Sequence, residues 1–81
     1  MIRDYIQYGE KNYLVSTTNI NGVLETMIFP INGHQISGNE VYCFRACTAN
    51  ESLEKYKDIL ENESKYLSDE AITNYIQSKY E

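Results

Sequence analysis

The dipeptide Asn21-Gly22 lies between two apolar runs within residues 13–29 and constrains the fold more than any other feature of this chain. Both residues tolerate the positive φ angles of a type I′ turn, whose twist matches that of the flanking strands. A two-residue loop at this point places Ile20 opposite Val23 and fixes the register of a β-hairpin. Counting back gives the other predicted cross-strand pairs: Thr17 with Thr26, Ser16 with Met27, Val15 with Ile28, and Leu14 with Phe29.

Both faces of this predicted hairpin carry apolar side chains near its open end. Because an antiparallel sheet needs to bury only one face, we expect helices on one side and either a partner or the N-terminal segment on the other. Three large side chains, Tyr13, Met27 and Phe29, are the candidate contact residues on the sheet.

The segments around the hairpin extend the sheet. Residues 1–9 alternate weakly and form either an edge strand or a loose arm. After Phe29 the chain meets Pro30 and several turn residues, which indicates a loop or a bulged second hairpin. A third strand is expected to start near Glu40. Its alternation directs one set of side chains to the core, Tyr42, Phe44 and Ala46, and another set away from it, Val41, Cys43 and Arg45.

Two helices follow. Thr48-Ala49-Asn50-Glu51 is typical of a capping box and predicts a helix from about residue 49 to residue 62. Ser68, followed by two acidic residues, predicts the cap of a second helix that ends near residue 80. The predicted buried residues follow helical spacing: Leu53, Tyr56 and Leu60 with Ile59 beside them, then Ile72, Tyr75, Ile76 and Tyr80.

These elements predict a single α+β domain over residues 1–81. We expect an antiparallel sheet of three to four strands over residues 13–46. Two antiparallel helices over residues 49–80 should pack on one face of it, because the link at 63–67 is short. A core of this size gives marginal stability and leaves no room for a deep catalytic cleft.

The net charge of −5 and the pI of 4.7 argue against direct binding to nucleic acid or to an anionic membrane, since both require a cationic surface. No apolar run approaches membrane-spanning length, and the first residues do not resemble a signal peptide. We therefore expect a protein of the cytoplasm.

Cys43 and Cys47 are the only cysteines, and His34 is the only histidine. On a strand the two cysteine Cα atoms would lie roughly 13 Å apart, too far for a disulfide, and they lack a second pair of metal ligands. We expect reduced, packed cysteines, a solvated histidine, no metal, no cofactor and no enzymatic activity.

An acidic stripe is the strongest candidate for a binding site. Its four members recur at intervals of three and four residues on the first predicted helix: Glu51, Glu54, Asp58 and Glu61. Rises of about 4.5 to 6 Å between them resemble the charge spacing of a nucleic-acid backbone. The stripe predicts either charge mimicry toward a basic protein groove, as in a nucleic-acid-binding nuclease, or an ordinary solvated helix face. Eight tyrosines without tryptophan favour either a contact surface or half-exposed packing.

Part of the chain resembles a known group of proteins. The segments 13–17, Tyr-Leu-Val-Ser-Thr, and 25–29, Glu-Thr-Met-Ile-Phe, are followed by Thr48, Glu51 and Leu53. This pattern is similar to the Y-x-V-S-T strand, E-T-M-x-F strand and T-x-E-E-A helix start shared by short proteins of phages and prophages. Those proteins usually carry a longer, glycine-rich and histidine-containing connection where this chain has only Asn21-Gly22. The resemblance implies a fold and a phage-like origin, and hence the cytoplasm of a host cell, and it supplies no catalytic residue.

Two functional hypotheses follow. A small acidic protein of phage type suggests an inhibitor or regulator of a host protein, and its composition resembles that of anti-CRISPR inhibitors. The alternative is a structural or accessory module that forms a homodimer and has no inhibitory activity.

Overall fold

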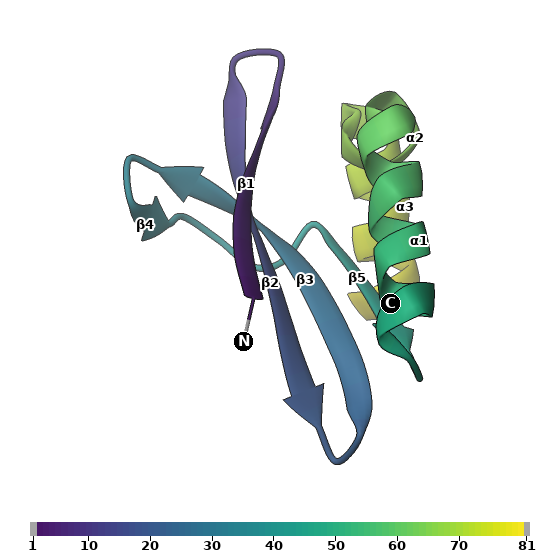
Figure 1. Cartoon of the computed structure of the whole chain (residues 1–81). Coiled ribbons are helices and arrows are strands. Elements are labelled where there is room, and N and C mark those ends of the chain that lie inside the picture. Colours follow the sequence, from purple (N-terminus) through teal and green to yellow (C-terminus); the bar gives the residue numbers. More distant parts are fainter. Residues whose placement is uncertain (1, 81) are drawn as a thin grey trace.

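The computed structural model describes residues 2–80 as an α+β fold, in which a five-stranded antiparallel sheet is followed by three helices (Figure 1). The strands are β1 (Ile2–Tyr8), β2 (Lys11–Ile20), β3 (Val23–Asn32), β4 (Gln35–Ile36) and β5 (Tyr42–Ala46). The helices are α1 (Ala49–Glu61), α2 (Glu63–Leu67) and α3 (Asp69–Tyr80). The α+β class predicted from the sequence is correct, although the prediction had three to four strands and two helices.

The central hairpin β2–β3 has the predicted register. Ile20 lies opposite Val23, and the pairing continues through Leu14 and Phe29. The φ angles of Asn21 and Gly22 are 53° and 87°, as a type I′ turn requires. The turn dipeptide therefore determines which side chains share each face of the sheet.

The remaining strands complete a meander. β1 is an edge strand that pairs along β2, so residues 2–8 belong to the sheet rather than to a loose arm. β3 continues through Pro30 and turns into β4, which resolves the segment after Phe29 as a second hairpin. β5 pairs with the first half of β3, from Leu24 to Ile28.

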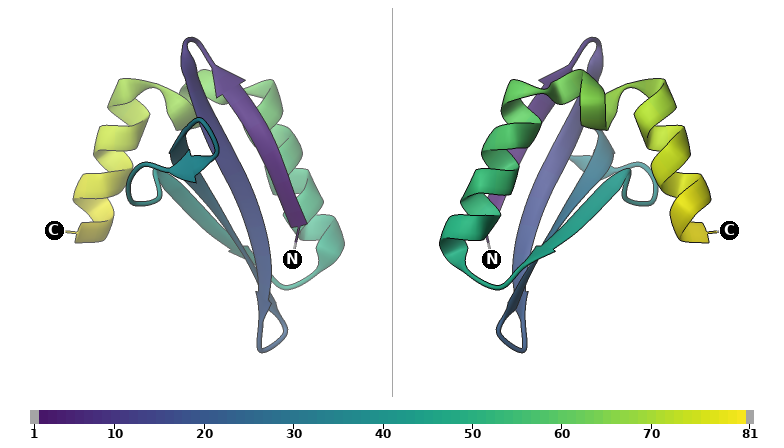
Figure 2. Two further views of the ribbon diagram at one scale, coloured as in Figure 1. Left: turned by 90° about the vertical axis from the view of Figure 1, so that its left-hand side faces the viewer. Right: turned by 90° about the vertical axis from the view of Figure 1, so that its right-hand side faces the viewer.

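All three helices lie on one face of the sheet (Figure 2). The segment 63–67, predicted as a link, is the short helix α2. From α2 the helices α1 and α3 diverge instead of packing side by side as the predicted antiparallel pair (Figure 2). α1 is attached to the edge strand β1 by the Tyr56 hydroxyl, which donates a hydrogen bond to Asp4 Oδ2 at 2.6 Å.

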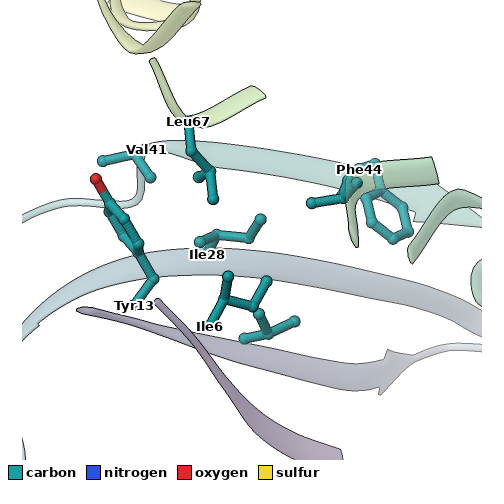
Figure 3. Packing of buried hydrophobic residues seen from close by; sticks show 8 residues of the cluster. Ile6, Tyr13, Ile28, Val41, Phe44 and Leu67 are labelled. Atoms are coloured by element: carbon teal, nitrogen blue, oxygen red, sulfur yellow. The ribbon is translucent and has the colours of Figure 1, made fainter. Parts of the chain in front are cut away.

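The core lies between the sheet and the helices (Figure 3). It is built from eight buried residues: Ile6, Tyr13, Val15, Ile28, Val41, Phe44, Ile59 and Leu67. Tyr13 is only 1% exposed, so its prediction as a surface contact residue is wrong. Residue 13 is on the helix-covered face, whereas Met27 and Phe29 are on the other face because they pair with Ser16 and Leu14.

Val41 departs from the predicted alternation. Its amide donates to the Ile28 carbonyl at 2.8 Å, although Ile28 is already paired with Tyr42. Two consecutive residues therefore oppose one, as in a β-bulge, and Val41 joins the core together with Phe44. Alternation alone could not predict the extra residue.

The helix faces are rotated from their predicted orientation. On α1 the buried residue is Ile59, whereas Leu53 and Leu60 are 52% and 45% exposed. Leu53 lines an apolar groove of about 400 Å³ between α1 and the β1–β2 edge. Within the described residues α3 has no buried side chain, and Ile76 and Tyr80, predicted to be buried, are exposed.

Candidate partner-binding surfaces

Glu51, the first member of the acidic stripe, is used by the fold. The Thr48 hydroxyl accepts a hydrogen bond from the Glu51 amide at 3.1 Å, as the capping box predicted. The Glu51 carboxylate accepts from the Cys47 amide at 3.4 Å rather than from the predicted Thr48 amide. It also pairs with Lys55 at 3.6 Å. This carboxylate stabilises the start of α1.

Asp58 is used as well. Its carboxylate accepts hydrogen bonds from the Tyr66 hydroxyl and, at 2.9 Å, from the Asn62 side-chain amide. The hydrogen bond to Asp58, together with burial, raises the pKa of Tyr66 to about 12. Asp58 thus joins α1 to α2, so the fold itself uses two members of the acidic stripe, Asp58 and Glu51.

Glu54 and Glu61 differ from these two residues. Both side chains are exposed, and neither forms an ion pair or a side-chain hydrogen bond within residues 2–80. They are the members of the stripe that the fold leaves available to a partner.

The stripe borders a hollow between α1 and β5, which we call the acidic hollow. Its volume is about 330 Å³, and it combines three carboxylates with three aromatic rings. The lining residues are Tyr42, Phe44, Glu51, Glu54, Lys55, Asp58, Ile59 and Tyr66. These carboxylates therefore lie beside the aromatic edge of the core and not on a purely solvated helix face.

One cation already lies at the edge of the acidic hollow. Lys55 Nζ donates to the Arg45 carbonyl at 3.0 Å and lies 5.7 Å from the centroid of the Phe44 ring. Carboxylates and ring faces both attract cations, and arginine makes the strongest contacts of this kind. The acidic hollow can therefore receive a basic side chain of another molecule beside Lys55.

The side of the sheet opposite the helices, which we call the open face, is the second candidate surface. Within residues 2–80 no helix lies on this side (Figure 2, left). Strand register assigns to it the following side chains: Arg3, Tyr5, Gln7, Asn12, Leu14, Ser16, Thr18, Ile20, Val23, Glu25, Met27, Phe29, Ile31, Ile36, Cys43 and Arg45.

An apolar row crosses the middle of the open face. Leu14 lies between Tyr5 on β1 and Phe29 on β3, and these neighbours reduce its exposure to 8%. Tyr5 is 63% exposed, and Ile36 on β4 is 52% exposed. Apolar side chains gathered on an uncovered face are typical of an interaction surface.

The predicted contact residues are thus only partly brought together. Met27 and Phe29 are both on the open face, where Tyr5 and Leu14 take the place of the buried Tyr13. The signal that identifies Leu14 was present in the sequence, because the turn register already placed it opposite Phe29. Tyr5 required the pairing of β1, which the sequence did not determine.

Side chains form hydrogen bonds with backbone groups of two edge strands, β1 and β5. At the β1 edge, Asp4 Oδ1 accepts from the Tyr5 amide at 2.8 Å. At the β5 edge, Lys55 Nζ donates a hydrogen bond to the Arg45 carbonyl. Backbone groups that already form these hydrogen bonds are not available to pair with a strand of another chain.

The cysteines and the histidine lie apart from the acidic hollow. Cys43 is partly buried on the open face, and burial raises the pKa of its thiol. Cys47 is exposed, so its predicted packing is wrong, and His34 is exposed in the β3–β4 turn. Across residues 2–80 no cluster of three or more histidine, cysteine or acidic side chains is placed to hold a metal ion.

No helix in this part of the chain has the length and apolar character of a membrane span.

Comparison of the chain with protein-family models, with curated proteins and with solved structures finds no match.

Proposed function

We propose that this chain is a small acidic protein of phage type that inhibits or regulates a host protein by binding a basic groove. The acidic hollow on α1 is the proposed contact site, and an arginine or lysine of the host protein is its proposed occupant. A nucleic-acid-binding nuclease has a groove of the required charge.

One observation carries this proposal: three carboxylates and three aromatic rings line a single hollow. An exposed acidic face alone would be explained by solvation. Carboxylates beside rings offer a basic side chain both a charge-assisted hydrogen bond and a cation–π contact. Glu54, which has no ion pair within residues 2–80, is free to supply the first of these.

The charge distribution supports the same orientation toward a partner. The helical segment 49–80 carries seven acidic residues, Glu51, Glu54, Asp58, Glu61, Glu63, Asp69 and Glu70, and four lysines, Lys55, Lys57, Lys65 and Lys79. A net negative helix layer attracts a basic groove at a distance and accelerates association, and salt weakens this attraction.

The test uses affinity capture from a host-cell lysate with the wild-type chain and with a Glu54→Lys, Glu61→Lys variant. Asp58 is left unchanged in this variant because the fold needs its carboxylate. The matched control is Glu10→Lys with Glu70→Lys, which reverses two exposed acidic residues outside the acidic hollow. We expect one protein to be retained by the wild-type chain and the control, lost with the variant, and released by duplex DNA or by added salt. Capture that survives reversal at positions 54 and 61 would contradict the proposal.

The alternative function, a homodimeric accessory module without inhibitory activity, is favoured by a different observation, the uncovered apolar side chains of the open face. Loss of every captured protein, together with stable self-association, would favour this alternative.

A further inference from the structure

From the open face we infer that this chain associates with a second copy of itself, sheet against sheet. The face presents the apolar row of Tyr5, Leu14 and Phe29, with Met27 and Ile31 on either side of it along β3. This interaction does not depend on the acidic hollow, which is on the helix-covered side of the sheet.

Charge favours a second copy as the occupant. The open face contains one acidic residue, Glu25, and its carboxylate is paired with Arg45 at 2.8 Å. The helix layer, with its seven acidic residues, is on the opposite side of the sheet. Two copies of a chain with net charge −5 repel one another least when their acidic layers point apart, and contact between the open faces achieves this arrangement.

The hydrogen bonds at the β1 and β5 edges favour face-to-face stacking of two sheets over pairing of their edge strands. On β1 the Asp4 carboxylate accepts a hydrogen bond from the Tyr5 amide, and on β5 the Arg45 carbonyl accepts one from Lys55. Strand pairing along β1 or β5 would have to break one of these contacts, and the third edge strand, β4, has only two residues. Face-to-face stacking leaves both intact and follows the aligned arrangement of two-layer sheet proteins.

The size of the open face sets the strength of association. Strand spacing and rise give four strands of about seven residues a footprint of roughly 20 by 23 Å, or on the order of 450 Å² in projection. Two such faces bury on the order of 900 Å², which is at the low end for specific interfaces. We therefore expect a reversible dimer with a Kd in the micromolar to millimolar range.

Overlap is greatest when the two-fold axis runs parallel to the strands, between β2 and β3. In this arrangement Leu14 of one copy faces Phe29 of the other, and β5 lies beneath β1 of its partner. Cys43 on β5 becomes covered, whereas Cys47, beyond the end of β5, stays exposed. The two cysteines provide a probe of the interface that needs no substitution.

The first experiment is sedimentation equilibrium from about 10 μM to about 1 mM protein, the range in which such a dimer forms. We expect the wild-type mass to rise from monomer to dimer and high salt to preserve or strengthen the dimer. Tyr5→Glu and Met27→Glu, each adding a charge to the open face, should keep the chain monomeric. Leu53→Glu is the matched control, since Leu53 is an exposed apolar residue on the helix side. Circular dichroism checks that each variant is folded.

A wild-type chain that remains monomeric at 1 mM, or a Tyr5→Glu variant that dimerises as tightly as wild type, would overturn the proposal.

Alkylation with N-ethylmaleimide, followed by mass spectrometry, locates the interface. Modification of Cys43 should fall as protein concentration rises while that of Cys47 does not change. Equal reactivity of Cys43 at both ends of the range would also contradict the proposed stacking. A monomer that still captures a host protein would leave the proposed function in place.

Discussion

The Glu40 carboxylate accepts a hydrogen bond from the Tyr80 hydroxyl at 2.9 Å and joins the loop before β5 to the last residue of α3. Glu40 is 8% exposed and also contacts Lys79 at 2.9 Å and Tyr75 at 3.2 Å. α3 has no buried side chain within the described residues, so these contacts help to attach it to the rest of the molecule, together with Ile72, which packs against the core, and Tyr75, whose ring centroid lies 5.6 Å from that of Tyr42.

Acid should release α3 through Glu40. The hydrogen bond from Lys79 is the main reason that the pKa of Glu40 lies below its ordinary value. A lowered pKa stabilises the folded state above the ordinary glutamate pKa, and the contribution is lost as pH falls through the lower folded-state value. We expect amide exchange in α3 to increase below about pH 4.5. Glu40→Gln should remove this pH dependence, and an unchanged profile would contradict the assignment.

The link between Asp58 and Tyr66 gives a second prediction. Hydrogen bonds to charged groups contribute about 1.5 to 3 kcal/mol, so Tyr66→Phe should lower the free energy of unfolding by roughly this amount. For a domain of this size each kcal/mol corresponds to about 4 to 8 °C in Tm. Asp58→Asn should lower the pKa of Tyr66 from about 12 toward the ordinary tyrosine value, as measured by phenolate absorbance. An unchanged tyrosine titration would argue against the contact.

The neighbouring residues Ile59 and Leu60 test the orientation of α1. Ile59 is 1% exposed, and Ile59→Ala should cost about 2 to 5 kcal/mol because it leaves a cavity in the core. Leu60→Ala is the control: at 45% exposure it should change stability by about 0.5 kcal/mol or less. Chemical denaturation measures both, and equal costs would contradict the orientation.

Local patterns predicted much of this fold. Asn21-Gly22 and strand alternation gave the correct β2–β3 register, and Thr48 and Ser68 marked the true helix starts, where each hydroxyl accepts a backbone hydrogen bond. The orientation of α1 could not be predicted in the same way. Ile59 and Leu60 are both apolar, and only contact with the sheet decides which of them is buried.

The candidate sites were also predicted only in part from the sequence. The acidic residues could be located from their spacing, but their convergence with Tyr42 and Tyr66 depends on the packing of α1 and α2 against β5. Tyr13 was misplaced because both faces of the hairpin are apolar, so composition could not identify the covered face. The bulge at Val41 adds one residue that no periodic pattern contains.

Gly22 gives a prediction about the turn. With a φ of 87° and no heavy atom within 4 Å of an added Cβ, Gly22→Ala meets only backbone strain, which should cost about 1 to 2 kcal/mol. Gly38→Ala is the control, since its added Cβ makes an ordinary 3.6 Å contact with Pro30. Thermal unfolding compares the two variants, and a neutral Gly22→Ala would contradict the turn geometry.

The central claim is that the acidic hollow receives a basic side chain, and an NMR titration with a short arginine-rich peptide tests it most directly. We expect the largest amide shift changes at hollow residues such as Tyr42, Glu54 and Tyr66, weakened by salt and abolished by Glu54→Lys. Shift changes spread evenly over the other exposed acidic residues, such as Glu10 and Glu70, or shifts that persist in Glu54→Lys, would contradict the account.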